Sequence, residues 1–118
     1  MSVANPEHFI RLPEPERSCV MFLRDYLKNY SPFISESVRV NTPFFYYKSK
    51  SLAFLSYDPK TKEIYLSFTK GYLITHAKLR SEGRKLMKIF RVDAYQDIDL
   101  KSLNEILDAM IRKGYTST

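Results

Sequence analysis

The stretch SLAFLSYDPKTKEIYLSF, residues 51–68, decides the fold, because it predicts a β-hairpin by itself. Ser51–Tyr57 and Glu63–Phe68 each alternate in the way that a half-buried antiparallel strand does. Between them lies Asp58–Lys62, in which Pro59 presets φ at the second turn position. In the first strand, Leu52 and Phe54 are expected on one face and Ala53, Leu55 and Tyr57 on the other. In the second strand, one face is expected to carry Ile64, Leu66 and Phe68.

The segments before this hairpin predict a helix followed by short strands. The helix is expected to begin at Glu14 and Glu16, whose carboxylates suit a first turn, and to end at Tyr30 before Ser31–Pro32. Its apolar positions are Val20, Leu23, Leu27 and Tyr30, with Cys19 and Tyr26 beside them. Beyond it we expect a short turn around Phe33, Ile34 and Ser37, a strand at Val38–Val40, an interruption at Asn41–Pro43, a strand at Phe44–Tyr47 and a turn at Lys48–Lys50.

The segments after the hairpin predict a last strand and a last helix. Leu73–Leu79 fits either a helical turn or an irregular crossing segment, and Leu86–Val92 predicts the strand. Asp97 or Asp99 is expected to cap the helix, and Gly114 to stop it. The buried stripe of that helix is expected at Leu103, Ile106, Leu107, Met110 and Ile111.

In this order the elements predict an α+β fold with two layers. We expect a mainly antiparallel sheet with the N- and C-terminal helices packed on one face, and an opposite face that carries Tyr and charged residues and is partly open. The chain of 118 residues is expected to form a single domain, 1–118, with a polar lead-in at 1–12 and a frayed tail at 115–118.

Composition limits the location and the partners. Cys19 is the only cysteine, which excludes an internal disulfide framework. No apolar run approaches the length of about 20 residues that spans a membrane. The N-terminal residues lack the pattern of a secretory signal, so we expect a cytoplasmic location. The formal charge of +6 is compatible with a lysine-rich surface or an anionic partner. Cations cluster between Lys78 and Arg91, but no nucleic-acid motif accompanies them, which argues against nucleic acid.

Catalytic and metal sites have little support in the sequence. The carboxylates are scattered, and His8 and His76 lack a ligand-like spacing to each other or to Cys19. Cys19 lies on the apolar helix face, as an inert buried thiol does. His76 could act as a base, but no second group is placed beside it. We therefore expect no catalytic residue, metal or cofactor, and an enzymatic function ranks below that of a binding module.

Aromatic residues gather in and around the predicted sheet. If Phe44 and Tyr46 face the helices, then Phe45 and Tyr47 face outward, because side chains alternate along a strand. An outward aromatic surface near lysines suits protein binding, a homodimer through the aromatic sheet face, or a small-ligand groove. The other interpretation is ordinary cross-strand packing.

Short motifs make the chain resemble the YdhG-like family of small bacterial domains, most of them of unknown function. The matching positions are Glu36, Thr42–Pro43, Leu52–Tyr57, Phe68, Lys70–Gly71, Leu79, Glu82–Gly83, Lys85, Lys88 and Asp97–Asp99. The resemblance covers roughly Glu16 to Lys113, and it implies a secretion-chaperone-like architecture. Some relatives are described as intracellular iron chaperones. Thr75–Ala77 departs from the family, whose members often have an acidic residue and a proline there, and this weakens a metal site.

The glycine turns flanked by cations are the candidate ligand site. The residues are Lys70, Gly71, Gly83, Arg84, Lys85 and Lys88. We expect glycine where the backbone needs a positive φ or approaches something closely. The hypothesis is that Lys70, Lys85 and Lys88 surround one anion-tolerant groove, and the alternative is that Lys88 passes the sheet edge and Lys85 is solvated. The sequence therefore favours a non-enzymatic binding module for a protein or an anionic small molecule; an iron-binding chaperone is the second hypothesis.

Overall fold

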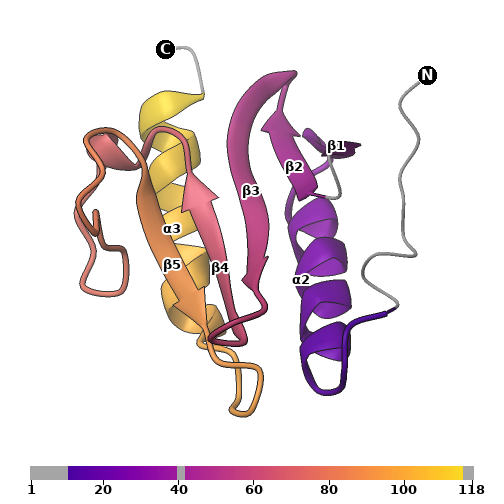
Figure 1. The fold of residues 1–118 in the computed structure, drawn as a ribbon. Helices are drawn as coiled ribbons and strands as arrows, with labels where there is room; N and C mark the ends of the chain where they lie inside the picture. Colours follow the sequence, from indigo (N-terminus) through magenta and orange to yellow (C-terminus); the bar gives the residue numbers. More distant parts are fainter. Residues whose placement is uncertain (1–10, 40–41, 116–118) are drawn as a thin grey trace.

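The computed structural model describes residues 11–39 and 42–115 (Figure 1). Five strands form one antiparallel sheet in the order β1-β2-β3-β4-β5. A 3₁₀ turn, η1, lies between β4 and β5, and one helix stands at each end of this series. The elements are α2 (Glu16–Tyr30), β1 (Ile34–Arg39), β2 (Thr42–Tyr47), β3 (Lys50–Asp58), β4 (Glu63–Phe68), η1 (Gly71–Leu73), β5 (Lys88–Val92) and α3 (Leu100–Gly114).

The two helices form a second layer on one face of the sheet, which confirms the α+β fold. α3 lies behind β4 and β5 in Figure 1, and α2 is joined to it by hydrogen bonds from Tyr26 to Asn104 and from Tyr30 to Asp108. Residues that the sequence placed on the apolar sides of the two helices and of the second hairpin strand form the core, and these are 0% exposed: Leu23, Leu27, Leu66, Phe68, Ile106, Leu107 and Met110. Within the described residues, no helix is long and apolar enough to cross a membrane.

Both predicted hairpin turns are confirmed. Between β2 and β3, Lys48 and Ser49 have φ values of 50° and 71°, as a two-residue turn with the right twist requires. Between β3 and β4, Lys62 donates its backbone N–H to the Asp58 carbonyl at 2.7 Å, and the Asp58 carboxylate accepts from the Lys60 backbone N–H at 2.9 Å. The second turn therefore ends the two strands at Asp58 and Glu63, which pair with each other.

The expected turn around Phe33, Ile34 and Ser37 is wrong, because Ile34–Arg39 is strand β1. Its buried residues are Ile34 and Val38, and helical spacing cannot be told from strand alternation by two positions four residues apart. β2 likewise begins at Thr42, earlier than expected, with Pro43 opposite Val38. Proline is tolerated near the first residue of a strand. Val40 and Asn41 lie outside the described residues.

A β-bulge changes the expected faces of the central strands. The pairing steps from Phe45 with Ala53 to Tyr46 with Ser51, which leaves Leu52 without a partner residue. Leu52 and Ala53 are consequently both 0% exposed, although they are neighbours in sequence. The expected sharing of a face by Leu52 and Phe54 is therefore wrong.

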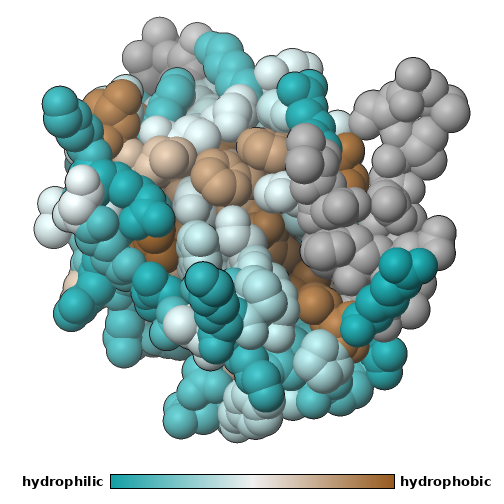
Figure 2. Space-filling model, in the orientation of Figure 1, coloured by the Kyte–Doolittle hydropathy of each residue, from teal (hydrophilic) through white to brown (hydrophobic). Residues whose placement is uncertain are grey.

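The faces of β2 are opposite to the arrangement considered from the sequence. Phe45 and Tyr47 are buried in the core, whereas Phe44 and Tyr46 lie on the open face. On that open face Phe44 packs on Phe54, with ring centroids 5.2 Å apart. Figure 2 shows this face toward the reader, with apolar residues gathered over its middle and hydrophilic residues around them. The same face carries Tyr46, and in the neighbouring strands Tyr65 lies beside Arg91, in agreement with the prediction of Tyr and charged residues there.

For α3, the sequence predicts the N-terminal cap correctly but not the C-terminal end. Asp99 caps α3, because its carboxylate accepts the Ser102 backbone N–H at 3.0 Å. Gly114 is the last residue of α3 and not a stop beyond it. A Cβ at Gly114 would lie 2.9 Å from Leu73 Cδ1, so close packing of α3 on η1 explains this glycine better than a capping conformation does.

Candidate anion-binding groove

The segment between β4 and β5 covers the outer edge of the sheet. Arg80 and Ile89 exchange two backbone hydrogen bonds, of 3.0 and 2.7 Å, in an antiparallel bridge. Ile89 is on the same side of β5 as Arg91, away from the helices, yet it is only 1% exposed. The irregular crossing segment, residues 74–87, therefore lies over this part of the sheet and forms the wall of a groove.

The tightest turn of the crossing segment carries the predicted positive-φ glycine. Arg84 donates its backbone N–H to the Ser81 carbonyl at 2.9 Å, and the two residues between them, Glu82 and Gly83, have φ values of 47° and 83°. Two successive positive φ values define a type I′ turn. A Cβ at Gly83 would meet no atom within 4 Å, so the turn projects into open space.

The groove between this segment and β5 has a volume of about 600 Å³. Three cations and two carboxylates contribute to its wall, which is otherwise small or apolar. The lining residues are Ala77, Lys78, Arg80, Glu82, Ile89, Phe90, Arg91 and Asp99. An anion that enters the groove therefore meets an excess of positive charge.

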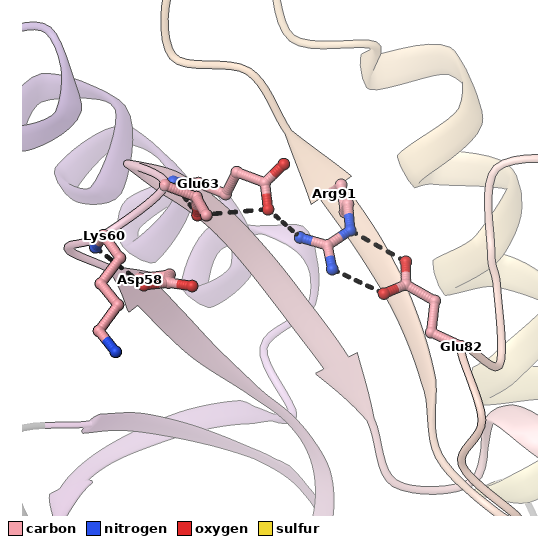
Figure 3. A network of polar contacts seen from close by, with 6 residues as sticks. Asp58, Lys60, Glu63, Glu82 and Arg91 are labelled. Carbon is pink, nitrogen blue, oxygen red and sulfur yellow. Dashed lines mark hydrogen bonds and ion pairs between the residues drawn. The ribbon is translucent and has the colours of Figure 1, made fainter.

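Arg91 is held between two carboxylates (Figure 3). Its Nε and Nη2 donate to Glu82 at 2.9 and 2.6 Å, and its Nη1 donates to Glu63 at 2.6 Å. The guanidinium also lies 5.3 Å from the ring centroid of Tyr65. Hydrogen bonds from Arg91 lower the pKa of the Glu82 carboxyl, and the same contacts raise the pKa of Arg91. Both groups are therefore charged at neutral pH.

Two other cations of the groove are available to a partner. Lys78 and Arg80 are exposed, and among the described residues their side-chain nitrogens have no hydrogen bond or ion pair. The Arg80 backbone is fixed by its bridge to Ile89, so its side chain projects from an ordered position. These two side chains were part of the predicted cationic cluster, but no sequence signal tied them to one groove.

The six residues predicted as a ligand site fall into two groups. Lys70 donates its ammonium to the Gly114 carbonyl at 2.9 Å, and Lys88 donates to the Ile74 carbonyl at 2.7 Å. Gly71 lies against Lys88, because a Cβ there would be 2.5 Å from the Lys88 backbone nitrogen. Lys70, Gly71 and Lys88 thus join η1, β5 and the end of α3. The other three, Gly83, Arg84 and Lys85, are exposed and follow Glu82 directly.

Two further polar clusters lie outside the groove. His76 Nε2 is 2.8 Å from Glu105, and its Nδ1 accepts the Lys78 backbone N–H at 3.0 Å. Sequence reasoning missed this pair because 29 residues separate its members. Glu16 is 0% exposed and accepts the Tyr95 hydroxyl at 2.9 Å, while its other oxygen has no hydrogen bond to any of the described residues.

Nothing described supplies a nucleophile to His76. Burial raises the pKa of the Cys19 thiol to about 11, which keeps it protonated near neutral pH. Among residues 11–39 and 42–115, no group of three or more His, Cys, Asp or Glu side chains could hold a metal ion. The groove beside β5 is the feature with the clearest binding chemistry.

No family model matches the chain, and no curated protein matches it. A solved structure does: the crystal structure of YdhG, a protein from the DUF1801 family of Bacillus subtilis. The two superpose with a TM-score of 0.69 over 98% of this chain and 94% of that one, at 18% sequence identity. The chain has the YdhG fold. The YdhG-like fold that the short motifs implied is thus confirmed, and at this identity the comparison shows the fold alone.

Proposed function

We propose that this YdhG-like domain is a non-enzymatic binding module for an anionic partner, and that the groove beside β5 is its binding site. The observation that carries the proposal is the pair Lys78 and Arg80, two exposed cations on the wall of a formed groove. Among the described residues their side-chain nitrogens make no hydrogen bond or close ion pair, and they act on Asp99 and Glu82 only by longer-range attraction. A ligand therefore does not have to break a direct contact to reach them.

The surroundings of the groove add to its positive potential. Arg84 and Lys85 are exposed on the neighbouring turn, and the chain as a whole carries +6. A surface of one charge sign accelerates the encounter with a partner of the opposite sign and does so less at high salt. Binding is therefore expected to weaken as ionic strength rises.

The predicted ligand residues have two roles in this proposal. Gly83, Arg84 and Lys85 form the rim beside Glu82 and meet the partner. Lys70, Gly71 and Lys88 have a structural role, because they fix η1 and the first residue of β5 against the end of α3. The proposed groove is therefore a different one from the groove expected around Lys70, Lys85 and Lys88, because none of these three lines it; its cations are Lys78, Arg80 and Arg91.

Charge reversal tests the proposal. The probe is a fluorescein-labelled hexaglutamate peptide, and its anisotropy is measured against protein concentration at low salt and at 0.15 M salt, about the physiological ionic strength. The double variant Lys78→Glu with Arg80→Glu should abolish binding. The matched control, Lys50→Glu with Lys60→Glu, loses the same charge at two exposed positions, the first residue of β3 and the turn that follows this strand. Equal binding by the two double variants would refute the groove.

Iron carriage, the second hypothesis, gains no support from the described residues. Their carboxylates do not converge on a group that could hold a metal ion. Of the two hypotheses, only the anion-binding module has a formed site in its favour.

A further inference from the structure

The contact between Glu82 and Arg91 has the geometry by which a protein would bind a carboxylate from elsewhere. Two nitrogens of one guanidinium donate to the two oxygens of one carboxylate, at 2.9 and 2.6 Å. Such a paired arrangement is the usual way in which arginine recognises a planar carboxylate. In the free domain, an internal side chain completes this arrangement on the wall of the groove.

We infer that Glu82 occupies the position of a partner's carboxylate, and that an acidic peptide segment binds by displacing it from Arg91. This inference rests on the proposed function and names its ligand class, a side-chain carboxylate of Asp or Glu. Lys78 and Arg80 would receive neighbouring acidic residues of the same peptide, since they line the same groove.

Glu82 is held in a way that permits displacement. The ion pair is exposed to solvent, with side-chain exposures of 42% for Arg91 and 25% for Glu82, and exposed pairs contribute little to stability. Glu82 is also a non-glycine residue at φ 47°, a conformation that costs free energy for a residue with a Cβ. Because the turn around Gly83 faces open space, it can move without disturbing the core.

Arg91 would stay in position when Glu82 leaves. Glu63 accepts a separate hydrogen bond from Nη1, at 2.6 Å, and Tyr65 lies against the guanidinium. Nε and Nη2, the two nitrogens that now contact Glu82, are then the ones presented to the ligand. Glu63 itself does not line the groove, so the two carboxylates on Arg91 differ in place although they have the same charge.

A carboxylate is the group that the wall of this groove already binds, because Glu82 makes the paired contact with Arg91. Asp99 remains on the wall after Glu82 has moved, and the groove then has one carboxylate among three cations. The remaining excess of positive charge suits a peptide that carries several Asp or Glu side chains.

Glu63 supplies the control for the test. Glu82→Gln and Glu63→Gln remove the same charge from the same arginine, but only the first empties the position in the groove. With the labelled hexaglutamate probe, Glu82→Gln should tighten binding about two- to fivefold, the range expected when an exposed ion pair no longer competes. Glu63→Gln should not tighten it. Adding Arg91→Lys to Glu82→Gln should remove the gain, because lysine cannot make the paired contact.

Other outcomes would overturn the inference. Equal tightening by Glu82→Gln and Glu63→Gln would show a general charge effect, and no tightening by either would show that Glu82 does not compete. Glu82→Gly, which suits the positive φ, repeats the test if the glutamine variant fails to fold. Stronger competition by inorganic phosphate or single-stranded oligonucleotide than by acetate or unlabelled hexaglutamate would refute the ligand class. The proposed function fails separately, if reversing Lys78 and Arg80 leaves peptide binding intact.

Discussion

Replacing each glycine of the chain by alanine should change stability by three different amounts, because the surroundings of the three glycines differ. At Gly71 a Cβ would lie 2.5 Å from the Lys88 backbone nitrogen and 2.6 Å from its Cβ. Real Cβ atoms do not approach so closely, and the atoms in the way belong to the backbone of β5 and the base of a side chain. Either η1 or β5 must move. We expect Gly71→Ala to lower the free energy of unfolding by at least about 2 kcal/mol.

Gly83 and Gly114 provide the matched controls for this loss. At Gly83 the added Cβ meets nothing, but φ is +83°, so the expected cost is about 1 kcal/mol of backbone strain. At Gly114 the nearest atom is Leu73 Cδ1, the end of a flexible side chain, at 2.9 Å. Alanine is preferred over glycine in a helix by about 1 kcal/mol, which offsets that contact, and the net change should be near zero.

Urea denaturation followed by circular dichroism measures all three variants on one scale. The expected order of the midpoints is Gly114→Ala nearest the native chain, then Gly83→Ala, then Gly71→Ala. A Gly71→Ala variant within about 0.5 kcal/mol of the native chain, the usual range for a surface substitution, would refute the close approach of η1 to β5.

The other predictions concern the core, the thiol, the helix cap and iron. Leu107→Ala should cost about 2–5 kcal/mol in the same denaturation assay, since Leu107 is 0% exposed; a silent variant would contradict the two-layer core. Cys19, with its pKa raised to about 11 by burial, should react with iodoacetamide at pH 8 only when the chain unfolds, as mass spectrometry would show. The backbone N–H of Ser102 lowers the pKa of Asp99 in the folded chain, so its stabilising effect is present above the unfolded pKa and is lost as pH falls through the folded one. Asp99→Asn should flatten this acid limb of the stability curve, and an unchanged limb would contradict the cap. Anaerobic calorimetry with ferrous iron should show no saturable site tighter than tens of micromolar, a threshold of roughly 6 kcal/mol; tight binding lost in Asp97→Asn with Asp99→Asn would favour the iron chaperone.

Local sequence patterns predict most of the elements, because each pattern depends on neighbours within a few residues. The amphipathic spacing of α2, the turn at Asp58–Lys62 and the cap at Asp99 are of this kind. Of β1, the sequence predicts the end at Val38 and Arg39 as strand but the beginning as a turn, because its two buried residues lie four apart, a spacing that helices and strands share. The faces of β2 and β3 depend on the bulge at Leu52, and a one-residue irregularity leaves no mark in an alternating pattern.

In the candidate site, too, local features could be predicted from the sequence and long-range contacts could not. A cationic segment with a positive-φ glycine could be predicted, and Gly83 has this conformation. The partners of its charges could not, because Arg91 meets Glu63 across 28 positions of sequence and Glu82 across nine. Tertiary packing decides which cations make internal contacts. Lys70 and Lys88 donate to backbone carbonyls, whereas Lys78 is left exposed.

The two hydrogen bonds between Arg80 and Ile89 also bear on how copies of this chain can meet. The last strand of a sheet ordinarily presents unpaired N–H and C=O groups, which another chain can extend into a continuous sheet. At Ile89 the chain's own crossing segment takes up those groups, and Arg80 adds charge at the same place. Growth of a shared sheet through β5 is thereby obstructed. The other edge of the sheet is β1, so a second copy that extended the sheet would have to pair there.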